Sequence, residues 1–170
     1  MSAKLPVKAA RHDLAVSSGA EDFVTMTIAE QLFGIPVLQV QDVLGHQRIT
    51  RIPLAPPEVA GSLNLRGRIV TAIDVRLRLG LPARPKSAPG AASTNSGMSI
   101  VVDLRGELYS LMVDSVGEVL SLSNEEFERN PSTLDPRWRD LSTGIYRLNN
   151  TLLVVLDVAR LLNFANIEAA

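Results

Sequence analysis

Short runs of apolar residues, separated by turn residues, recur along the whole chain and predict strands rather than long helices. Residues 23–28 and 32–35 are two such runs around a polar break, which predicts a hairpin. Residues 37–44 fit a helical turn followed by a strand. Residues 69–73 are apolar at successive positions, so both faces of this strand should be covered. The fold is therefore predicted to be mostly β.

The pattern occurs twice, and this repeat is the strongest structural signal in the sequence. Residues 26–44 align with residues 102–120 at a constant offset of 76, and residues 61–79 align with residues 144–162 at an offset of 83. Two copies of this kind predict two small β-barrels, too small to be stable alone and therefore packed together. Their contact is expected along two apolar strands, residues 69–73 and 152–156.

The repeat and the composition together predict a domain organisation. Residues 1–20 are predicted to be a disordered tail, and residues 21–165 a single domain of two barrel subdomains, about 21–81 and 98–165. Strands could be exchanged between the subdomains, and a C-terminal helix is expected. Residues 82–97 are rich in Pro, Ala, Ser and Gly, which predicts a flexible loop between the two copies.

Composition narrows the classes of protein that the chain can belong to. Hydrophobic residues make up 46% of the 170 residues, which is typical of a globular protein with a real core, whereas only 4% are aromatic. The absence of cysteine excludes disulfides and fits a reducing compartment, with the cytoplasm as the default. No apolar run approaches the 18 residues of a membrane span, so membrane association is expected only through a partner.

Charge is distributed unevenly, although the net charge is only -1. Residues 45–86 hold eight basic residues against two acidic ones, a balance of +6, whereas residues 98–170 hold six arginines against eleven acids, a balance of -5. A positive end and a negative end are therefore predicted. A nucleic-acid-binding β-barrel using residues 45–86 is an alternative function, against which stand the lack of aromatic residues there and the negative net charge.

Catalytic chemistry finds little support. The only histidines are His12 and His46, and no glycine-rich loop follows a strand, so neither an enzyme nor a bound metal or cofactor is predicted. Asp74 and Asp157 hold the same place in each copy, directly after an apolar strand, which favours helix capping over acid-base catalysis. Trp138 is predicted to fill the long loop of the second copy rather than to anchor an interface.

Arg66 is the main candidate for binding a partner. It lies beside Gly67 at a predicted hairpin tip, and the repeat places Asn149 opposite it, so the turn itself does not need an arginine. Asn64 is unmatched in the same way, because Arg147 stands in its place. Four further positions fit either a binding surface or a core valine beside a solvated acid: Val40, Asp42, Val116 and Glu118.

Five segments, in order, resemble the CheW family of chemotaxis coupling proteins: residues 33–43, 49–53, 61–67, 69–76 and 113–122. The tetrad Asn-Leu-Arg-Gly at residues 64–67, with the strand that follows it, is the most specific of these. The resemblance extends from about residue 23 to residue 164.

The resemblance implies two SH3-like five-stranded β-barrels without enzymatic activity. It also implies an adaptor that joins the cytoplasmic tips of methyl-accepting chemotaxis receptors to the regulatory domain of the histidine kinase CheA, with adaptor and kinase alternating head to tail in rings at the inner face of the membrane. Carried over onto this chain, the partner-binding residues are Arg66, Asn64, Gly61, Val40 and Asp42.

Two departures from the commoner family pattern keep a second pathway open. Thr71 and Ala72 stand where a Pro-Ile pair is frequent, and the connection at residues 82–97 is longer than usual. An adaptor of a non-flagellar chemosensory pathway, such as pilus motility, is therefore the alternative within the same family.

Overall fold

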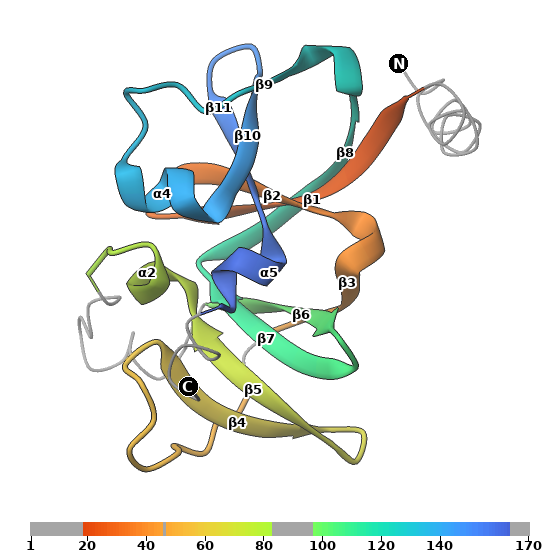
Figure 1. Cartoon of the computed structure of the whole chain (residues 1–170). Coiled ribbons are helices and arrows are strands. Elements are labelled where there is room, and N and C mark those ends of the chain that lie inside the picture. The colour runs from red at the N-terminus through yellow and green to blue at the C-terminus, as the bar shows by residue number, and fades with distance from the viewer. Residues whose placement is uncertain (1–18, 46, 83–96, 164–170) are drawn as a thin grey trace.

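Two β-sheets, one above the other in Figure 1, form the body of this computed structural model, which describes residues 19–45, 47–82 and 97–163. The upper sheet, called sheet A, consists of β1 (Ala20–Ile28), β2 (Gln31–Pro36), β8 (Ser115–Ser123), β9 (Phe127–Glu128), β10 (Ser142–Arg147) and β11 (Leu152–Leu156). The lower sheet, called sheet B, consists of β3 (Val40–Leu44), β4 (Val59–Leu65), β5 (Arg68–Asp74), β6 (Met98–Leu104) and β7 (Glu107–Val113). The short helices are η1 (Val37–Gln39), α2 (Val75–Arg78), η2 (Asn124–Glu126), α4 (Pro136–Leu141) and α5 (Val158–Leu161).

The predicted elements of the first copy are present. β1 and β2 form the predicted antiparallel hairpin, and η1 followed by β3 is the predicted helical turn and strand. The mostly β fold with two packed sheets is confirmed, with the two-residue strand β9 as an addition at the edge of sheet A. The described residues exclude most of the predicted tail (residues 1–18), most of the predicted loop (residues 83–96) and both histidines. The first described strand, β1, begins at Ala20.

Strands are exchanged between the two copies of the repeat. The spatial order is β8-β1-β2-β11-β10-β9 in sheet A and β3-β6-β7-β5-β4 in sheet B. The first copy's hairpin, β1–β2, therefore lies in sheet A with the remaining strands of the second copy. The second copy's hairpin, β6–β7, lies in sheet B with the remaining strands of the first copy. The parallel pairs β2–β11 and β7–β5 join each hairpin to its sheet. As a result the sheets divide the chain differently from the two copies: sheet B spans residues 40–113, and sheet A takes the strands on either side.

A central apolar core lies between the sheets and draws buried residues from both. The strands β5 and β11 each contribute one face to it, with Ile73 and Leu156, and turn their other face to a smaller core within their own sheet. The prediction that these strands hold the halves together is confirmed, with one correction. Ile69 is 69% exposed, because it pairs with Asn64 next to the hairpin tip, beyond the part of β5 that the central core covers.

Asp74 and Asp157 cap helices, as predicted. The Asp74 carboxylate accepts a hydrogen bond from the backbone N–H of Leu77 (3.3 Å), and Asp157 accepts one from the N–H of Arg160 (3.1 Å). Both carboxylates thus satisfy donors at the start of α2 and α5. Helix capping accounts for both carboxylates, so neither is assigned to catalysis.

Trp138, predicted to fill the long loop of the second copy, packs against the central core. Its ring meets Phe33 edge-on, with the centroids 5.3 Å apart, and its indole N–H donates to the carbonyl oxygen of Leu79 (3.0 Å). The helix α4, which precedes β10 of sheet A, is thereby attached to the end of α2, which follows β5 of sheet B.

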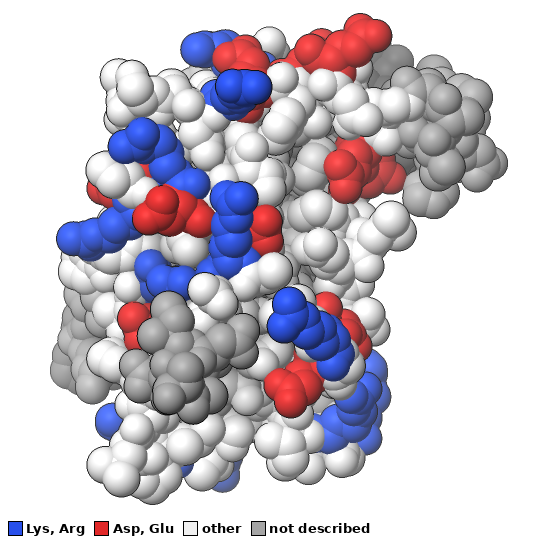
Figure 2. Space-filling view, viewed as in Figure 1, with Lys and Arg blue, Asp and Glu red and all other residues white. Residues whose placement is uncertain are grey.

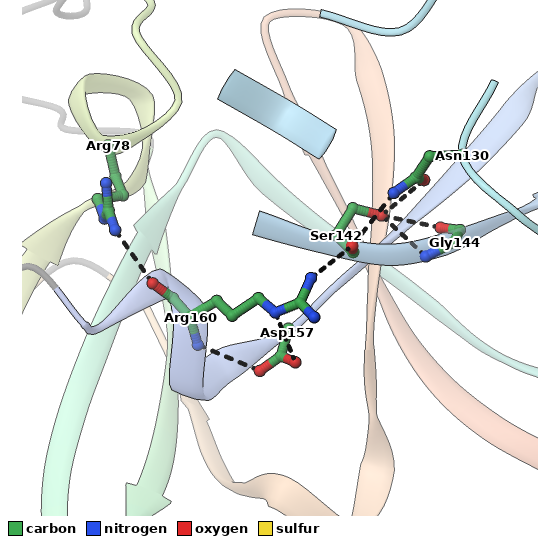
Figure 3. A network of polar contacts seen from close by, with 6 residues as sticks. All are labelled: Arg78, Asn130, Ser142, Gly144, Asp157 and Arg160. Carbon is green, nitrogen blue, oxygen red and sulfur yellow. Dashed lines mark hydrogen bonds and ion pairs between the residues drawn. The ribbon is translucent and has the colours of Figure 1, made fainter. Parts of the chain in front are cut away.

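Polar contacts also join the helical ends of the two sheets (Figure 3). Arg78, on α2, donates to the carbonyl oxygens of Leu161 (2.7 Å) and Arg160 (3.0 Å) at the end of α5. The guanidinium of Arg160 in turn donates to the carbonyl oxygen of Ser142 (3.3 Å), where β10 begins. Burial lowers the pKa of Arg78 from its ordinary value, but the group stays charged at neutral pH.

Candidate functional site

The hairpin between β4 and β5 has the geometry expected of a tight turn with an arginine at its tip. Arg66 has φ 52° and Gly67 has φ 86°, both in the left-handed region. The Asn64 side-chain oxygen accepts the backbone N–H of Gly67 at 2.9 Å and holds the turn in shape. Asn64 therefore stabilises the turn, and the turn places Arg66 at the tip of the hairpin.

Arg66 forms an ion pair within its own chain. Its guanidinium lies 3.1 Å from the carboxylate of Asp42, with 78% of the Arg66 side chain exposed and 28% of that of Asp42. Asp42 belongs to β3 and Arg66 follows β4, the two edge strands of sheet B, so the pair connects the sheet's opposite edges. Exposed pairs contribute between 0 and about 1 kcal/mol. The contact therefore orients the arginine more than it stabilises the fold.

The other predicted partner-binding residues do not all join this site. Val40 and Val116 are half-buried and pack against the central core, in sheet B and sheet A respectively. Glu118 is exposed on β8, and its backbone carbonyl accepts the Thr25 hydroxyl at 2.6 Å. The structure thus brings Asn64, Arg66 and Asp42 together and leaves Glu118 on the other sheet.

Gly61 has a packing role. It has φ 151°, and a Cβ placed there would overlap the carbonyl oxygen of Thr50 and approach Ile49 to 2.6 Å. The close approach is that of the antiparallel bridge between Thr50 and Ser62. Gly144, its counterpart in the repeat, is equally crowded, because a Cβ would lie 2.5 Å from the carbonyl oxygen of Glu128.

An ion pair that the sequence pattern does not indicate lies where sheet B meets sheet A. Arg76, on α2, makes two hydrogen bonds to Asp114, at 3.0 and 2.9 Å, with side chains only 17% and 21% exposed. Asp114 also accepts the backbone N–H of Ala29 in the β1–β2 turn (2.8 Å). The hydrogen bond to Asp114 raises the pKa of Arg76, so the guanidinium stays charged at neutral pH.

Two clefts on the described surface hold polar groups that already have structural partners. One, of about 460 Å³, is lined by Arg76, Asp114 and Asp74, the ion pair and cap described above. The other, of about 430 Å³, lies between α2, α4 and α5, where Arg78 and Arg137 donate to helix-end carbonyls. Among the described residues, no group of three His, Cys, Asp or Glu side chains is placed to hold a metal ion. No helix there has the length and apolarity needed to cross a membrane.

Both tyrosines of the chain, Tyr109 and Tyr146, have raised pKa values, chiefly because burial disfavours the phenolate. Below pH 10 the neutral phenols contribute their full stability, which is lost as the pH rises through their folded-state pKa values. We therefore expect the tyrosinate absorbance of the native protein to titrate with a higher midpoint than that of the protein unfolded in urea, which should lie near 10. A native titration centred at 10 would contradict this burial.

Basic and acidic side chains alternate over both lobes on the face shown in Figure 2, where the predicted positive and negative ends are not seen. Strand exchange is the reason, because β6 and β7 carry acids of the second copy into sheet B. Asp103 and Glu107 thus flank a turn whose Gly106 carbonyl accepts a hydrogen bond from Arg68 of the first copy (3.3 Å).

Comparison with known proteins matches residues 22–166 to the family model described as the CheW-like domain. The chemotaxis protein CheW of Klebsiella aerogenes is 29% identical over 150 residues, covering 88% of this chain and 86% of that protein. CheW of Rhizobium meliloti is 24% identical over 95% of this chain and 98% of its own length. The crystal structure of the scaffolding protein TtCheW from Thermoanaerobacter tengcongensis aligns with a TM-score of 0.69 and 29% identity, covering 81% of this chain and 88% of that one.

Proposed function

Since the chain belongs to the CheW-like domain family, we propose that it is a non-catalytic adaptor coupling methyl-accepting chemotaxis receptors to the histidine kinase CheA. The observation that carries the assignment is the match along nearly the whole domain, in sequence and in fold. In this role it lies in the cytoplasm at receptor arrays, reaches the membrane only through receptors, and alternates head to tail with the kinase.

The partner surface that we propose centres on Arg66. The arginine stands at a hairpin tip, largely exposed, and Asp42 orients its guanidinium from the opposite edge of the sheet. Arginine suits this position because its planar group binds carboxylates through two parallel hydrogen bonds. Val40 lies two residues before Asp42 on the same strand and supplies apolar contact beside it.

The acids beside these arginines disfavour the alternative of nucleic acid binding. Arg66 pairs with Asp42, and Arg68 contacts the turn that Asp103 and Glu107 flank. A continuous row of phosphates would meet these carboxylates as well as the arginines. A protein partner with separate charged side chains can avoid them.

The test is recruitment to receptor-containing membranes, measured by co-sedimentation with the receptor and the CheA encoded in the same genome. The unaltered protein is expected to sediment with both, and Arg66→Glu to remain in the supernatant while keeping its melting temperature. Arg139→Glu, an equal charge change on the exposed face of α4, serves as the matched control and should sediment like the unaltered protein.

A charge exchange separates the two roles of Arg66. If the arginine matters only through its pair with Asp42, combining Arg66→Glu with Asp42→Arg restores recruitment; if it docks on the partner, recruitment stays lost. Failure of the unaltered protein to sediment would refute the adaptor function. Undiminished sedimentation of Arg66→Glu would refute the placement of the surface.

A further inference from the structure

The tetrad of the β4–β5 hairpin occurs a second time in the chain. Residues 64–67 read Asn-Leu-Arg-Gly, and residues 103–106, at the β6–β7 hairpin, read Asp-Leu-Arg-Gly. The second turn repeats the first in detail: Arg105 has φ 55° and Gly106 has φ 86°, and the Asp103 carboxylate accepts the N–H of Gly106 at 3.0 Å. Two arginines are thus presented by the same local structure.

The two tips lie side by side at one end of sheet B. β5 and β7 are parallel neighbours, so the hairpin turns that precede them lie at the same end of the strands, at the right of sheet B in Figure 1. Arg68, the first residue of β5, donates to the carbonyl oxygen of Gly106 at 3.3 Å and connects the tips. Arg66 and Arg105 are therefore carried by neighbouring turns of one sheet.

The fold does not require arginine at either tip. The repeat places the β10–β11 turn, with Asn149 and Asn150, opposite the first tip, and the β1–β2 turn, with Ala29 and Glu30, opposite the second. The equivalent end of sheet A therefore has no arginine in either turn. In the left-handed region an arginine is also less favourable than asparagine or glycine.

Both tips are open to solvent. A Cβ built on Gly67 or on Gly106 would meet no atom within 4 Å. Arg105 is exposed, and in the part of the chain that the structure describes it makes no hydrogen bond or ion pair. Its guanidinium is thus available to a partner, whereas that of Arg66 is already oriented by Asp42.

We propose that the two tips form one docking surface, on which Arg105 binds a carboxylate of the same protein partner that Arg66 binds. This rests on the proposed function and adds to it a second arginine that no part of the repeat explains. The occupant is an acidic protein surface rather than a nucleic acid, because Asp42, Asp103 and Glu107 lie among the arginines and would repel a continuous polyanion.

The decisive variant is Arg105→Asn, because asparagine favours the backbone conformation of the turn while removing the charge. Its affinity for the cytoplasmic fragment of the receptor, or for CheA, is expected to fall about fivefold at 0.1 M salt, an effect in the range of a charge at the rim of an interface. Its melting temperature should be unchanged or about 2 °C higher. Arg139→Asn, which removes one exposed charge from α4, is the matched control.

Titration calorimetry of the full chain against each partner, with Arg66→Asn measured in parallel, distinguishes the outcomes. Loss of affinity in both tip variants, greatest when they are combined, supports the two-tip surface. If Arg66→Asn weakens binding and Arg105→Asn does not, the second tip is refuted while the adaptor function stands. A lower melting temperature in Arg105→Asn would make that arginine structural and also refute the proposal. If the unaltered protein binds neither partner, the adaptor function fails and the surface with it.

Discussion

Replacing Gly61 by alanine is expected to lower the free energy of unfolding by about 3 kcal/mol, since both backbone strain and overpacking act at this position. The residue has φ 151°, a conformation that side chains rarely adopt, and the new methyl group would collide with the carbonyl oxygen of Thr50 and with Ile49. The Thr50 carbonyl cannot move away without breaking the bridge from Thr50 to Ser62. Urea denaturation at neutral pH measures the loss.

Two other glycines calibrate this prediction. Gly144→Ala, at the matching position of the repeat, should also be destabilising but by less, because Phe127 and Glu128 crowd it without an unfavourable φ. Gly67→Ala should cost only about 1 kcal/mol, because the space around it is open and only its backbone conformation is unfavourable. Equal stabilities of Gly61→Ala and Gly67→Ala would show that the crowding at Thr50 is not real.

This comparison changes how Gly61 should be understood at the partner surface. The family resemblance places it among the partner-binding residues, but its duplication as Gly144 and its contact with Thr50 give it a role in the scaffold. A loss of recruitment in a Gly61 variant is therefore expected to follow from a distorted β4, and to be accompanied by a lower melting temperature. Arg66→Glu should show the first effect without the second.

Breaking the ion pair between Arg76 and Asp114 is the second large effect that we expect. Asp114→Ala should lower the free energy of unfolding by about 3 kcal/mol, because it leaves a largely buried guanidinium without a carboxylate, with the Pro82 carbonyl oxygen as its remaining acceptor. The same change removes the acceptor for the N–H of Ala29, so the β1–β2 turn loses its attachment. Thermal and urea unfolding should report the loss together.

A double-mutant cycle isolates the pair. Arg76→Ala combined with Asp114→Ala should cost at least about 1 kcal/mol less than the sum of the single changes, because neither charge is then left alone. The repeat supports this, since Leu38 and Ala159 occupy the matching positions and sheet A forms without such a pair. Arg147→Ala, which breaks the exposed pair with Glu128, is the control and should cost less than about 1 kcal/mol. Additive losses would contradict a direct interaction.

Local features of the fold could be predicted from the sequence because they depend on neighbouring residues. The caps at Asp74 and Asp157 and the turn at Arg66 follow from residue type and from comparison of the two copies. The exposure of Ile69 could not be predicted, because alternation along a strand tells which face a residue takes and not how far along the strand that face is covered.

The pairing of strands that are distant in the chain was harder to predict from the sequence. Hydrophobic periodicity does not say which strand is the neighbour, so the exchange of hairpins between the copies appears only in the sheet order. The Arg76–Asp114 pair joins residues 38 positions apart and has no signal in the repeat except the absence of counterparts. The second arginine tip, by contrast, has a signal in the sequence, because residues 103–106 repeat the tetrad with Asp in place of Asn.

The placement of sheet B within a continuous stretch of the chain sets an order for folding during synthesis. Residues 40–113 supply every strand of that sheet, so it can close while the ribosome is still adding the rest of the protein. The β1–β2 hairpin is made first but must wait for β11, which begins at Leu152, before its parallel neighbour exists. Until β10 and β11 are made, Phe23 also lacks the small core that it forms with Tyr146, Leu153 and Val155, so we expect this apolar side of the first hairpin to stay exposed in the nascent chain.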